Sequence, residues 1–280
     1  MRLGLIGTDS SHAELFLDSF NAASRHPGQR IVALWGSDQE RARTLAKRGG
    51  DLAVVAQPEA MLGVVDGAIV GDRDGDLHLA HAAPFLEAGL PVFIDKPLAN
   101  SPRDAEALVA LARRRGAALC SASALRWQGD MEELKRRLAA LGALQEVEAY
   151  GTWYPESEYG GPIFYGIHTV ELAQELVGSS WEGVSVAGGA SPRVTFRAGP
   201  IPVQLAFRPL GQSGESEFGV RVRAEGGELA MPIRLPDDYM DPVIARIAEM
   251  MRTGRSPLSD RDLVSPVALM HEIGLQLAHD

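Results

Sequence analysis

The first 120 residues alternate short apolar segments with amphipathic ones, and this alternation constrains the fold more than any other feature. The apolar segments have the length of strands, and the segments between them have the apolar spacing of helices. Such a pattern predicts a parallel sheet with helices on both faces. The expected strands are 2–7, 30–36, 52–56, 67–71, 91–95 and 117–121, and the expected helices are 12–24, 38–48, 58–63, 76–89 and 102–115.

From about residue 145 the pattern changes to longer segments of alternating polarity, separated by Gly, Pro and Ser. These segments predict a mostly antiparallel sheet. They are 144–154, 183–199, 201–210 and 218–233, with expected helices at 163–177, 241–252 and 262–278. The sequence therefore predicts an α/β protein, in which a doubly wound parallel sheet (residues 1–120) precedes an α+β domain with an open sheet (residues 121–280). The C-terminal helices can pack back on the first domain.

Composition excludes several classes of protein. The formal net charge of -10 argues against a nucleic-acid partner, and the basic run at 113–115 is interpreted as a solvated helix end. The single cysteine, Cys120, lies in an apolar strand and is expected to be a buried thiol, which fits the cytoplasm. No apolar run is long enough to span a membrane and no signal peptide is recognisable, so we expect a cytoplasmic protein without membrane contact.

Ligands of doubly wound sheets collect at the carboxyl ends of the strands, so the polar residues that follow each strand are the candidate binding residues. After the first strand, Gly7 permits a tight turn, but Asp9 and His12 stand where a Gly-x-Gly-x-x-Gly fingerprint has its second and third glycines. Hydroxyls at Ser10 and Ser11 favour binding of a pyrophosphate at this turn.

Two features of this turn oppose phosphate binding. Ser11 and Glu14 have the spacing of a capping box, which would occupy the first N–H groups of the helix. The Asp9 carboxylate must also point away from a bound phosphate. The alternative to a binding loop is a well-capped turn without a ligand. The candidate cofactor-binding residues are Gly7, Thr8, Asp9, Ser10, Ser11 and His12.

The turn after the second strand lacks the acidic residue that usually binds the ribose of NAD. Gly36 and Ser37 stand there instead, so NADP is as compatible with this turn as NAD, with Ser37 and Arg41 as candidate contacts. The alternative is that this segment serves the next helix, with Asp38 as its N-cap.

The turn after the fourth strand is rich in aspartate. The spacing of its acidic residues resembles a calcium loop, but the glycine comes one position early and Ala83 stands where a bidentate Glu is needed. His78 and His81 could share a metal, but no third ligand follows at a useful spacing. We therefore predict no metal site, and a surface or cleft-lining role for the two histidines. Gly71, Asp72 and His78 are candidate cofactor contacts.

The strongest signal follows the fifth strand, where Asp95, Lys96 and Pro97 put a carboxylate and an amine at the expected nicotinamide position. An amine there can act as general acid and base. The alternative is an exposed ion pair in a loop.

These residues, together with 125–127 and 160–178, resemble the Gfo/Idh/MocA oxidoreductases over nearly the whole chain. The family typically has Glu-Lys-Pro, matched by Asp95, Lys96 and Pro97, and a later Gly-Gly-x-x-x-Asp-x-Gly-x-His motif. The later motif is matched imperfectly by Gly160, Gly161, Gly166 and His168. The resemblance implies a Rossmann-type first domain, NAD or NADP as cofactor, and a sugar, polyol or related alcohol as substrate.

The resemblance also assigns roles to residues. Lys96 would be the general acid and base, assisted by His168, and Asp95 would lie near the cofactor. Phe164 replaces the family's Asp, and Tyr165, three residues before His168, is the candidate substitute partner. The residues expected near the substrate are Arg126, Trp153, Tyr154, Tyr165 and His168.

The resulting hypothesis is an NAD(P)-dependent dehydrogenase or reductase acting on a carbinol carbon of a small molecule. The alternatives are a redox-neutral lyase or glycosidase that uses NAD, and a non-catalytic ligand-binding or regulatory protein on the same scaffold. We also expect a homo-oligomer formed through the outer face of the C-terminal sheet, where Val203, Leu205 and Phe207 alternate with Gln204 and Arg208.

Overall fold

The computed structural model describes residues 1–211 and 217–278, which form two compact units. The first unit contains Met1–Ala122 and Met240–Leu263, and the second contains Ser123–Tyr239 and the residues from Val264 onward. The chain therefore returns to the first unit after most of the second is complete.

The first unit is built on a parallel sheet of six strands in the order β3-β2-β1-β4-β5-β6. From β1 the chain adds strands on one side, then crosses to the other side at β4, so the turns after β1 and β4 flank the point where the order reverses. Ligands of such sheets bind at that point. The strands are β1 (Arg2–Ile6), β2 (Arg30–Trp35), β3 (Ala53–Val54), β4 (Gly67–Val70), β5 (Val92–Ile94) and β6 (Leu119–Ser121).

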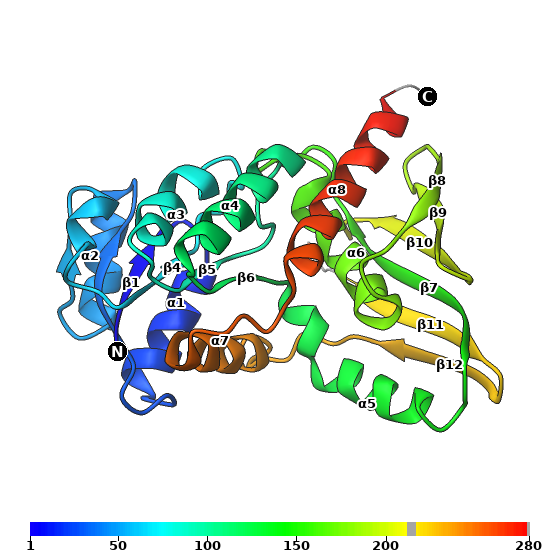
Figure 1. Ribbon diagram of the computed structural model, residues 1–280, viewed down its shortest axis with the longest axis horizontal. Coiled ribbons are helices and arrows are strands. Elements are labelled where there is room, and N and C mark those ends of the chain that lie inside the picture. Colours follow the sequence, from blue (N-terminus) through cyan, green and yellow to red (C-terminus); the bar gives the residue numbers. More distant parts are fainter. Residues whose placement is uncertain (212–216, 279–280) are drawn as a thin grey trace. The chain divides into compact units, whose positions relative to one another are not determined.

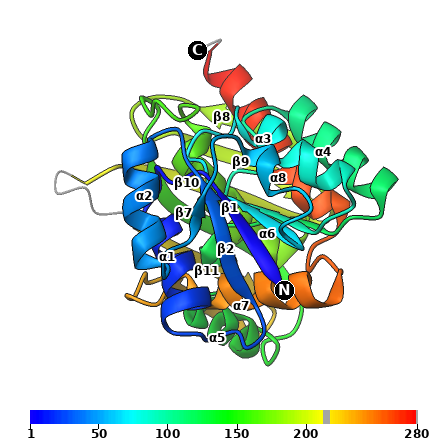
Figure 2. The ribbon, with the colours of Figure 1, turned by 90° about the vertical axis from the view of Figure 1, so that its left-hand side faces the viewer.

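Helices cover both faces of this sheet, with α1 and α2 on one side and α3 and α4 on the other (Figure 2). The predicted helix at 102–115 forms with those limits, because Ser101 caps its first turn and Gly116 ends it at φ +64°. The helices of this unit are α1 (His12–Leu17), α2 (Gln39–Arg48), α3 (His78–Glu87), α4 (Pro102–Arg115) and α7 (Asp241–Thr253).

Two helix predictions in this unit need correction. The segment predicted as one helix over 12–24 is α1 followed by a π-helical turn, η1 (Asp18–Ala22). The predicted helix at 58–63 is a single 3₁₀ turn, η2 (Pro58–Met61). Both segments are short, and backbone type in such short pieces is decided by packing rather than by apolar spacing.

The second unit is built on a six-stranded sheet in the order β12-β11-β7-β10-β9-β8, antiparallel except for the parallel pair β7 and β10. Its strands are β7 (Leu144–Trp153), β8 (Glu182–Ala187), β9 (Arg193–Ala198), β10 (Ile201–Pro209), β11 (Phe218–Ala224) and β12 (Gly227–Pro232). The helix α6 (Ile163–Val177) lies against one face (Figure 1). The remaining helical elements are η3 (Ala124–Trp127), α5 (Gly129–Leu138) and α8 (Asp260–Leu277).

The two faces of this sheet differ sharply in polarity. Val203, Leu205 and Phe207 are all buried on the inner face. The outer face instead carries cross-strand ion pairs, with Arg221 3.0 Å from Glu148 and Arg223 2.6 Å from Glu146. The expected exposed apolar stripe is therefore absent, because the apolar side chains are used in the core.

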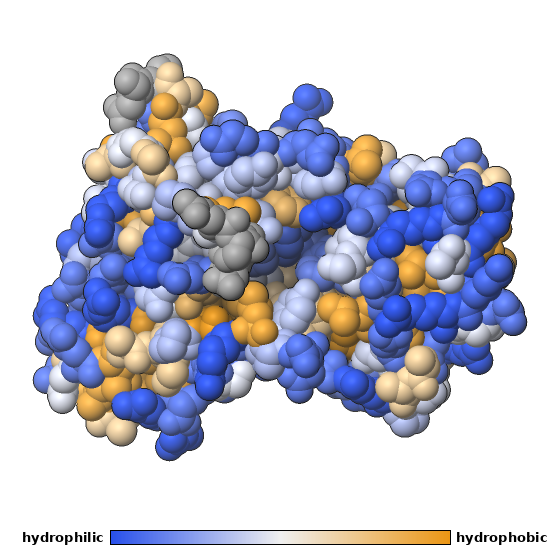
Figure 3. Space-filling model, turned by 180° about the vertical axis from the view of Figure 1, so that it is seen from behind, coloured by the Kyte–Doolittle hydropathy of each residue, from blue (hydrophilic) through white to orange (hydrophobic). Residues whose placement is uncertain are grey.

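The described surface has few large apolar side chains that are exposed, and hydrophobic residues lie among hydrophilic ones on the side seen in Figure 3. Cys120 is 1% exposed, which confirms the buried thiol. None of the described helices combines the length and the apolar content that a membrane crossing requires.

Candidate functional site

The turn after β1 is held against the turns after β2 and β4. Gly7 has φ +85°, and a Cβ atom there would lie 2.4 Å from the backbone nitrogen of Asp72. The side chain of Thr8, 2% exposed, packs against Gly36, where an added Cβ would also collide with it. Both glycines are thus required by close approach of neighbouring turns.

The start of α1 differs from the predicted capping box. Ser11 has helical backbone angles, φ -63° and ψ -19°, and its side chain makes no capping hydrogen bond. Ser10 takes that role, since its hydroxyl oxygen accepts the N–H of His12 at 3.1 Å. Glu14 pairs with Arg41 at 3.2 Å instead of reaching back to the cap. The capping box that would have competed with a ligand is absent.

The alternative that Asp38 caps α2 is confirmed. Its carboxylate accepts the N–H groups of Glu40 at 2.9 Å and Arg41 at 3.0 Å. The Arg41 guanidinium reaches back across the sheet edge to the carbonyl oxygens of Thr8 and Ser10, and its side chain remains 35% exposed. Ser37 is exposed. The segment after β2 therefore caps α2 through Asp38 and supports the turn after β1 through Arg41.

The turn after β4 is fixed by two histidines of α3. His78 is fully buried, with Nε2 2.9 Å from the carbonyl oxygen of Asp72 and Nδ1 2.9 Å from that of Pro97. His78 therefore links the turns after β4 and β5, and the expected surface or cleft-lining role is wrong for it. Because His78 is buried, we expect it to act on a cofactor through these two turns.

His81 pairs with the Asp72 carboxylate at 2.8 Å. Burial alone would lower the pKa of His81, but the hydrogen bond and the charge of Asp72 raise it above its usual value. The Asp9 carboxylate turns to the same segment and accepts the N–H of Arg73 at 3.2 Å. Among the described residues, no group of three or more potential ligands could hold a metal ion.

Asp95 and Lys96, directly after β5, are 4% and 8% exposed, so the alternative of an exposed loop pair is wrong. The Asp95 carboxylate accepts the backbone N–H of Lys96 at 2.9 Å and lies 2.5 Å from Nδ1 of His12. Burial alone would raise the pKa of Asp95, but attraction to His12 and Lys96 and their hydrogen bonds lower it to about 2. His12, at the third glycine position, thus holds the carboxylate that precedes Lys96.

In the second unit His168 has a partner that the sequence did not reveal. Its Nδ1 lies 2.6 Å from the hydroxyl oxygen of Ser123, at the start of η3. The Tyr165 ring is also close, with ring centroids 6.3 Å apart. A serine just after β6 could have been noted as a candidate, but only the tertiary structure brings residues 123 and 168 together.

Arg126 lies in a buried ion-pair network. Its Nε donates to Glu171 at 2.8 Å and its Nη1 to Glu175 at 2.9 Å, with only 3% of the side chain exposed. Burial raises the pKa of Glu171, although Arg126 and the N–H of Ser123 act in the opposite direction. Because Arg126 is buried, we expect it to act on a substrate indirectly, through Glu171 and Ser123.

The aromatic residues expected near the substrate fall into two groups. Trp153 is 4% exposed and packs on Phe207, with ring centroids 4.6 Å apart, so it belongs to the core. Tyr154 is 39% exposed and lies edge-to-face with Tyr165 at 6.4 Å. Tyr154, Tyr165 and His168 thus form the accessible part of this candidate region.

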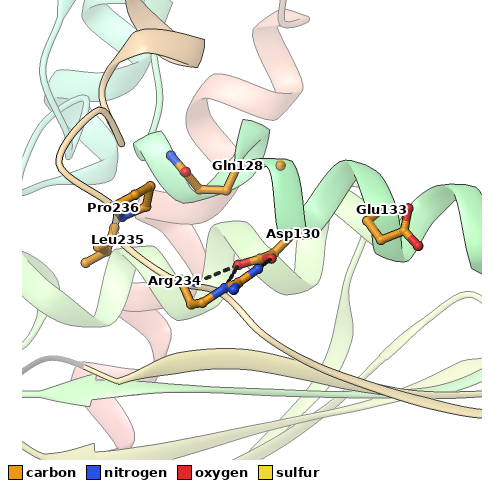
Figure 4. Close-up of a pocket in the computed structure, with 7 residues that line it drawn as sticks. Gln128, Asp130, Glu133, Arg234, Leu235 and Pro236 are labelled. Carbon is orange, nitrogen blue, oxygen red and sulfur yellow. Dashed lines mark hydrogen bonds and ion pairs between the residues drawn. The ribbon is translucent and has the colours of Figure 1, made fainter.

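A cavity of about 670 Å³ lies elsewhere on the second unit (Figure 4). Two of its charged lining residues, Asp130 and Arg234, pair with each other at 2.5 Å. None of the predicted site residues lines this cavity, which is bordered by Gln128, Gly129, Asp130, Glu133, Arg234, Leu235 and Pro236.

Comparison with known proteins gives consistent results. Residues 1–123 match the model of the oxidoreductase family with an NAD-binding Rossmann fold, GFO_IDH_MocA. Inositol 2-dehydrogenase 1 of Saccharopolyspora erythraea is 33% identical over 50% of this chain and 42% of its own. D-glucoside 3-dehydrogenase of Escherichia coli is 29% identical over 53% of this chain and 46% of its own. The chain thus spans about half the length of the curated relatives it matches.

Solved structures extend the likeness in fold to the whole chain. Myo-inositol dehydrogenase from Lactobacillus casei, solved with NAD(H) and myo-inositol, has a TM-score of 0.83 at 17% identity and covers 100% of this chain and 95% of its own. Myo-inositol dehydrogenase from Corynebacterium glutamicum has a TM-score of 0.83 at 16% identity, covering 100% and 97%. At these identities the likeness establishes the fold.

Proposed function

We propose that this chain, a member of the Gfo/Idh/MocA oxidoreductases by its residues 1–123, is an NAD(P)-dependent dehydrogenase or reductase. The substrate is a sugar, a polyol or a related small molecule with an oxidisable carbinol carbon. The observation that carries the proposal is Lys96, an amine 8% exposed at the carboxyl end of a parallel strand. It stands in a sheet with the strand order of dinucleotide-binding domains.

The turns at the strand ends fit a dinucleotide. A Cβ atom at Gly71 would meet no atom closer than 3.7 Å and would make ordinary van der Waals contacts with the end of β1 and the turn after it. The predicted capping box of Ser11 and Glu14 is absent, and among the described residues the only N–H group of the first turn that a side chain is shown to cap is that of His12, which donates to Ser10. Gly7, Thr8, Ser10, Ser11, Gly71 and Asp72 are the residues we expect to hold the cofactor.

The turn after β2 supports either nucleotide. Its one nearby carboxylate, Asp38, is used as the cap of α2 and does not take the position that discriminates against a 2′-phosphate. The exposed hydroxyl of Ser37 and the partly exposed guanidinium of Arg41 are suited to a phosphate or to a ribose hydroxyl. We therefore propose that the chain uses NAD or NADP.

When bound, the cofactor supplies the acceptor or donor of a hydride. Lys96 takes the proton from the substrate hydroxyl during oxidation and returns it to the carbonyl oxygen during reduction. His12 and the N–H of Lys96 occupy the Asp95 carboxylate, which fixes the backbone at Lys96. His168 holds the substrate oxygen, and Tyr154 and Tyr165 contact the rest of the substrate.

Thermal melts with NADH, with NADPH and without ligand test the proposal. A nucleotide present at 100 times its dissociation constant should stabilise the protein by about 2.7 kcal/mol. Sugars and polyols, supplied with the oxidised form of the nucleotide that binds, should then reveal turnover by the increase in nicotinamide absorbance.

Lys96→Ala is the matched control, because it should retain the melting shift and lose turnover. Absence of a shift with both nucleotides would overturn the proposal and favour the non-catalytic alternative. Product formation without net change in absorbance would favour the redox-neutral alternative.

We also propose that the protein forms a homo-oligomer through the outer face of the second sheet. The helix α6 covers the other face, and the outer face has ordered cross-strand ion pairs and the Arg208 guanidinium 4.0 Å above the Tyr150 ring. These features suit a polar interface with a second copy of the chain rather than the apolar one expected from the sequence.

A further inference from the structure

The hydroxyl of Ser123 lies within hydrogen-bond distance of the His168 ring, and Ser123 is held by further hydrogen bonds of its own. The residue is 0% exposed. Its backbone N–H donates to Glu171 at 2.8 Å, and its hydroxyl oxygen accepts the N–H of Leu125 at 3.1 Å. The same oxygen lies 2.6 Å from Nδ1 of His168. The hydroxyl oxygen therefore has two neighbours, the N–H of Leu125 and Nδ1 of His168. The N–H of Leu125 can only donate to it.

The proton of this hydroxyl has one acceptor among the described residues. A serine hydroxyl offers one proton and two lone pairs, and Leu125 uses one lone pair. If Nδ1 of His168 carried a hydrogen, it would donate to the second lone pair and leave the hydroxyl proton buried without an acceptor. If Nδ1 is bare, the hydroxyl donates to it and both groups are satisfied.

We propose that Ser123 is a positioning residue that donates its proton to Nδ1 of His168 and so holds the neutral imidazole with its hydrogen on Nε2. A carboxylate in this position would do the opposite, because it can only accept and would keep the hydrogen on Nδ1. His168 thus presents an N–H donor at Nε2 rather than a bare nitrogen base.

The backbone around Ser123 is held firmly enough to maintain this orientation. Glu171, which accepts the N–H of Ser123, is fixed by the Nε atom of Arg126, and Arg126 is fixed in turn by Glu175. On the other side, the Phe218 ring lies edge-to-face with the His168 ring at 5.4 Å. The hydroxyl and the imidazole therefore face each other from two constrained segments.

The consequence for the reaction rests on the proposed function. An Nε2 hydrogen stabilises a substrate oxygen, either the carbonyl oxygen of the oxidised form or a hydroxyl oxygen as it loses its proton. An imidazole that already carries a hydrogen on Nε2 cannot take the proton of the substrate hydroxyl at that atom. The role of base is thereby left to Lys96, and His168 selects substrates that offer an oxygen acceptor.

The tautomer of His168 can be measured directly by long-range ¹H–¹⁵N correlation spectra of the full chain labelled at its histidines. The spectra are recorded at about pH 9, well above the usual imidazole pKa of about 6.5. His168→Gln assigns the signals among the seven histidines. We expect a pyrrole-type shift at Nε2 and a pyridine-type shift at Nδ1, as for a single tautomer. A pyrrole-type shift at Nδ1 overturns the proposal without any variant.

Two substitutions then test whether Ser123 is the cause. Ser123→Thr keeps the hydroxyl and should retain the single tautomer, whereas Ser123→Ala should give averaged shifts from a mixture of the two. A purely structural role would leave the tautomer of the folded variant unchanged, so an unmixed Ser123→Ala spectrum assigns the tautomer to another cause and refutes the role of Ser123.

The same wild-type sample, melted with NADH and NADPH, separates this inference from the proposed function. If the spectra show the expected tautomer but neither nucleotide raises the melting temperature, only the proposed function is contradicted. If a nucleotide raises the melting temperature but the tautomer is wrong, only this inference is contradicted.

Discussion

Lys96 and His168 are proposed to carry different parts of the chemistry, so their removal should have different effects. A positioned acid and base contributes about 10²–10⁴-fold to a proton transfer. We expect Lys96→Ala to lower kcat by roughly 10²-fold or more while the affinity for the nucleotide changes much less. His168→Ala should cost less, because it removes a donor rather than the base. Steady-state kinetics with the first substrate found measures both. Near wild-type turnover of Lys96→Ala together with an inactive His168→Ala would reverse these roles.

The ion pair of Asp72 and His81 should make stability depend on pH in a defined direction. The pKa of His81 is raised in the folded protein, mainly through Asp72 acting against burial. The pair therefore adds stability below the unfolded value of about 6.5, and this contribution is lost as the pH rises through the folded pKa.

Urea unfolding of wild type and His81→Asn at pH 6 and pH 9 measures this contribution. The difference in unfolding free energy between the two proteins should be larger at pH 6. In an Asp72→Asn background this dependence on pH should disappear. An equal difference at both pH values would contradict the assignment.

At the scale of elements, the turn after β1 offers a matched pair of glycines. Gly7→Ala puts a Cβ 2.4 Å from the backbone of Asp72 at a φ of +85°, and should destabilise the protein by about 1–3 kcal/mol. Gly71→Ala meets nothing closer than 3.7 Å and should leave stability within about 1 kcal/mol of wild type. Gly71→Ala should nevertheless weaken nucleotide binding, because Gly71 is one of the residues proposed to hold the cofactor. Denaturant unfolding and nucleotide titration distinguish the two, and equal stability of both variants would refute the steric argument.

The connection between η3 and α6 depends on a buried ion pair. Arg126→Met leaves the Glu171 carboxylate buried without its main counter-charge, so we expect a loss of about 3–5 kcal/mol in unfolding free energy. Arg136→Ala is the matched control in the same unit, because its pair with Glu133 is exposed and should contribute less than about 1 kcal/mol. Urea denaturation of both variants tests this, and similar losses would show that burial of the pair is unimportant.

Elements with strong local signals were predictable from sequence. The helices at 102–115 and 163–177 have the predicted limits, and the order of strands and helices follows the apolar pattern. The start of α1 was not predictable in detail, because Ser10 and Ser11 are both suitable caps and only the path of the turn decides between them. Local pattern identifies a cap, whereas tertiary packing selects the residue that makes it.

Candidate residues of the site could be chosen from the sequence, whereas their pairings could not. Lys96 and Asp95 are candidates because they directly follow a strand whose carboxyl end is a typical binding position. The partners His12 of Asp95 and Ser123 of His168 lie 83 and 45 residues away in sequence, and no local pattern links them. Arg126 was expected at the substrate because of the family resemblance, but it is buried, and Glu171 and Glu175 compensate its burial.

At the scale of the whole molecule, the proposed homo-oligomer can be tested by mass. Light scattering at micromolar concentration should give a multiple of the 30.0 kDa chain. Arg221→Glu and Arg223→Glu place like charges beside Glu148 and Glu146 on the outer face, and should reduce the mass towards that of one chain. A substitution on the exposed helical pair, Arg136→Ala, should leave the mass unchanged. A wild-type mass of about 30 kDa would contradict the proposal.

The contact between His12 and Asp95 makes two distant turns of the first unit depend on each other. An engineer who transplanted an ordinary glycine-rich turn into positions 7–12 would remove the imidazole and leave the buried Asp95 carboxylate, next to Lys96, without its nearest side-chain hydrogen-bond partner. The glycine pattern would be restored while the neighbouring turn lost its support. Residues 12 and 95 therefore form one exchangeable module, and a graft between relatives should carry both or neither.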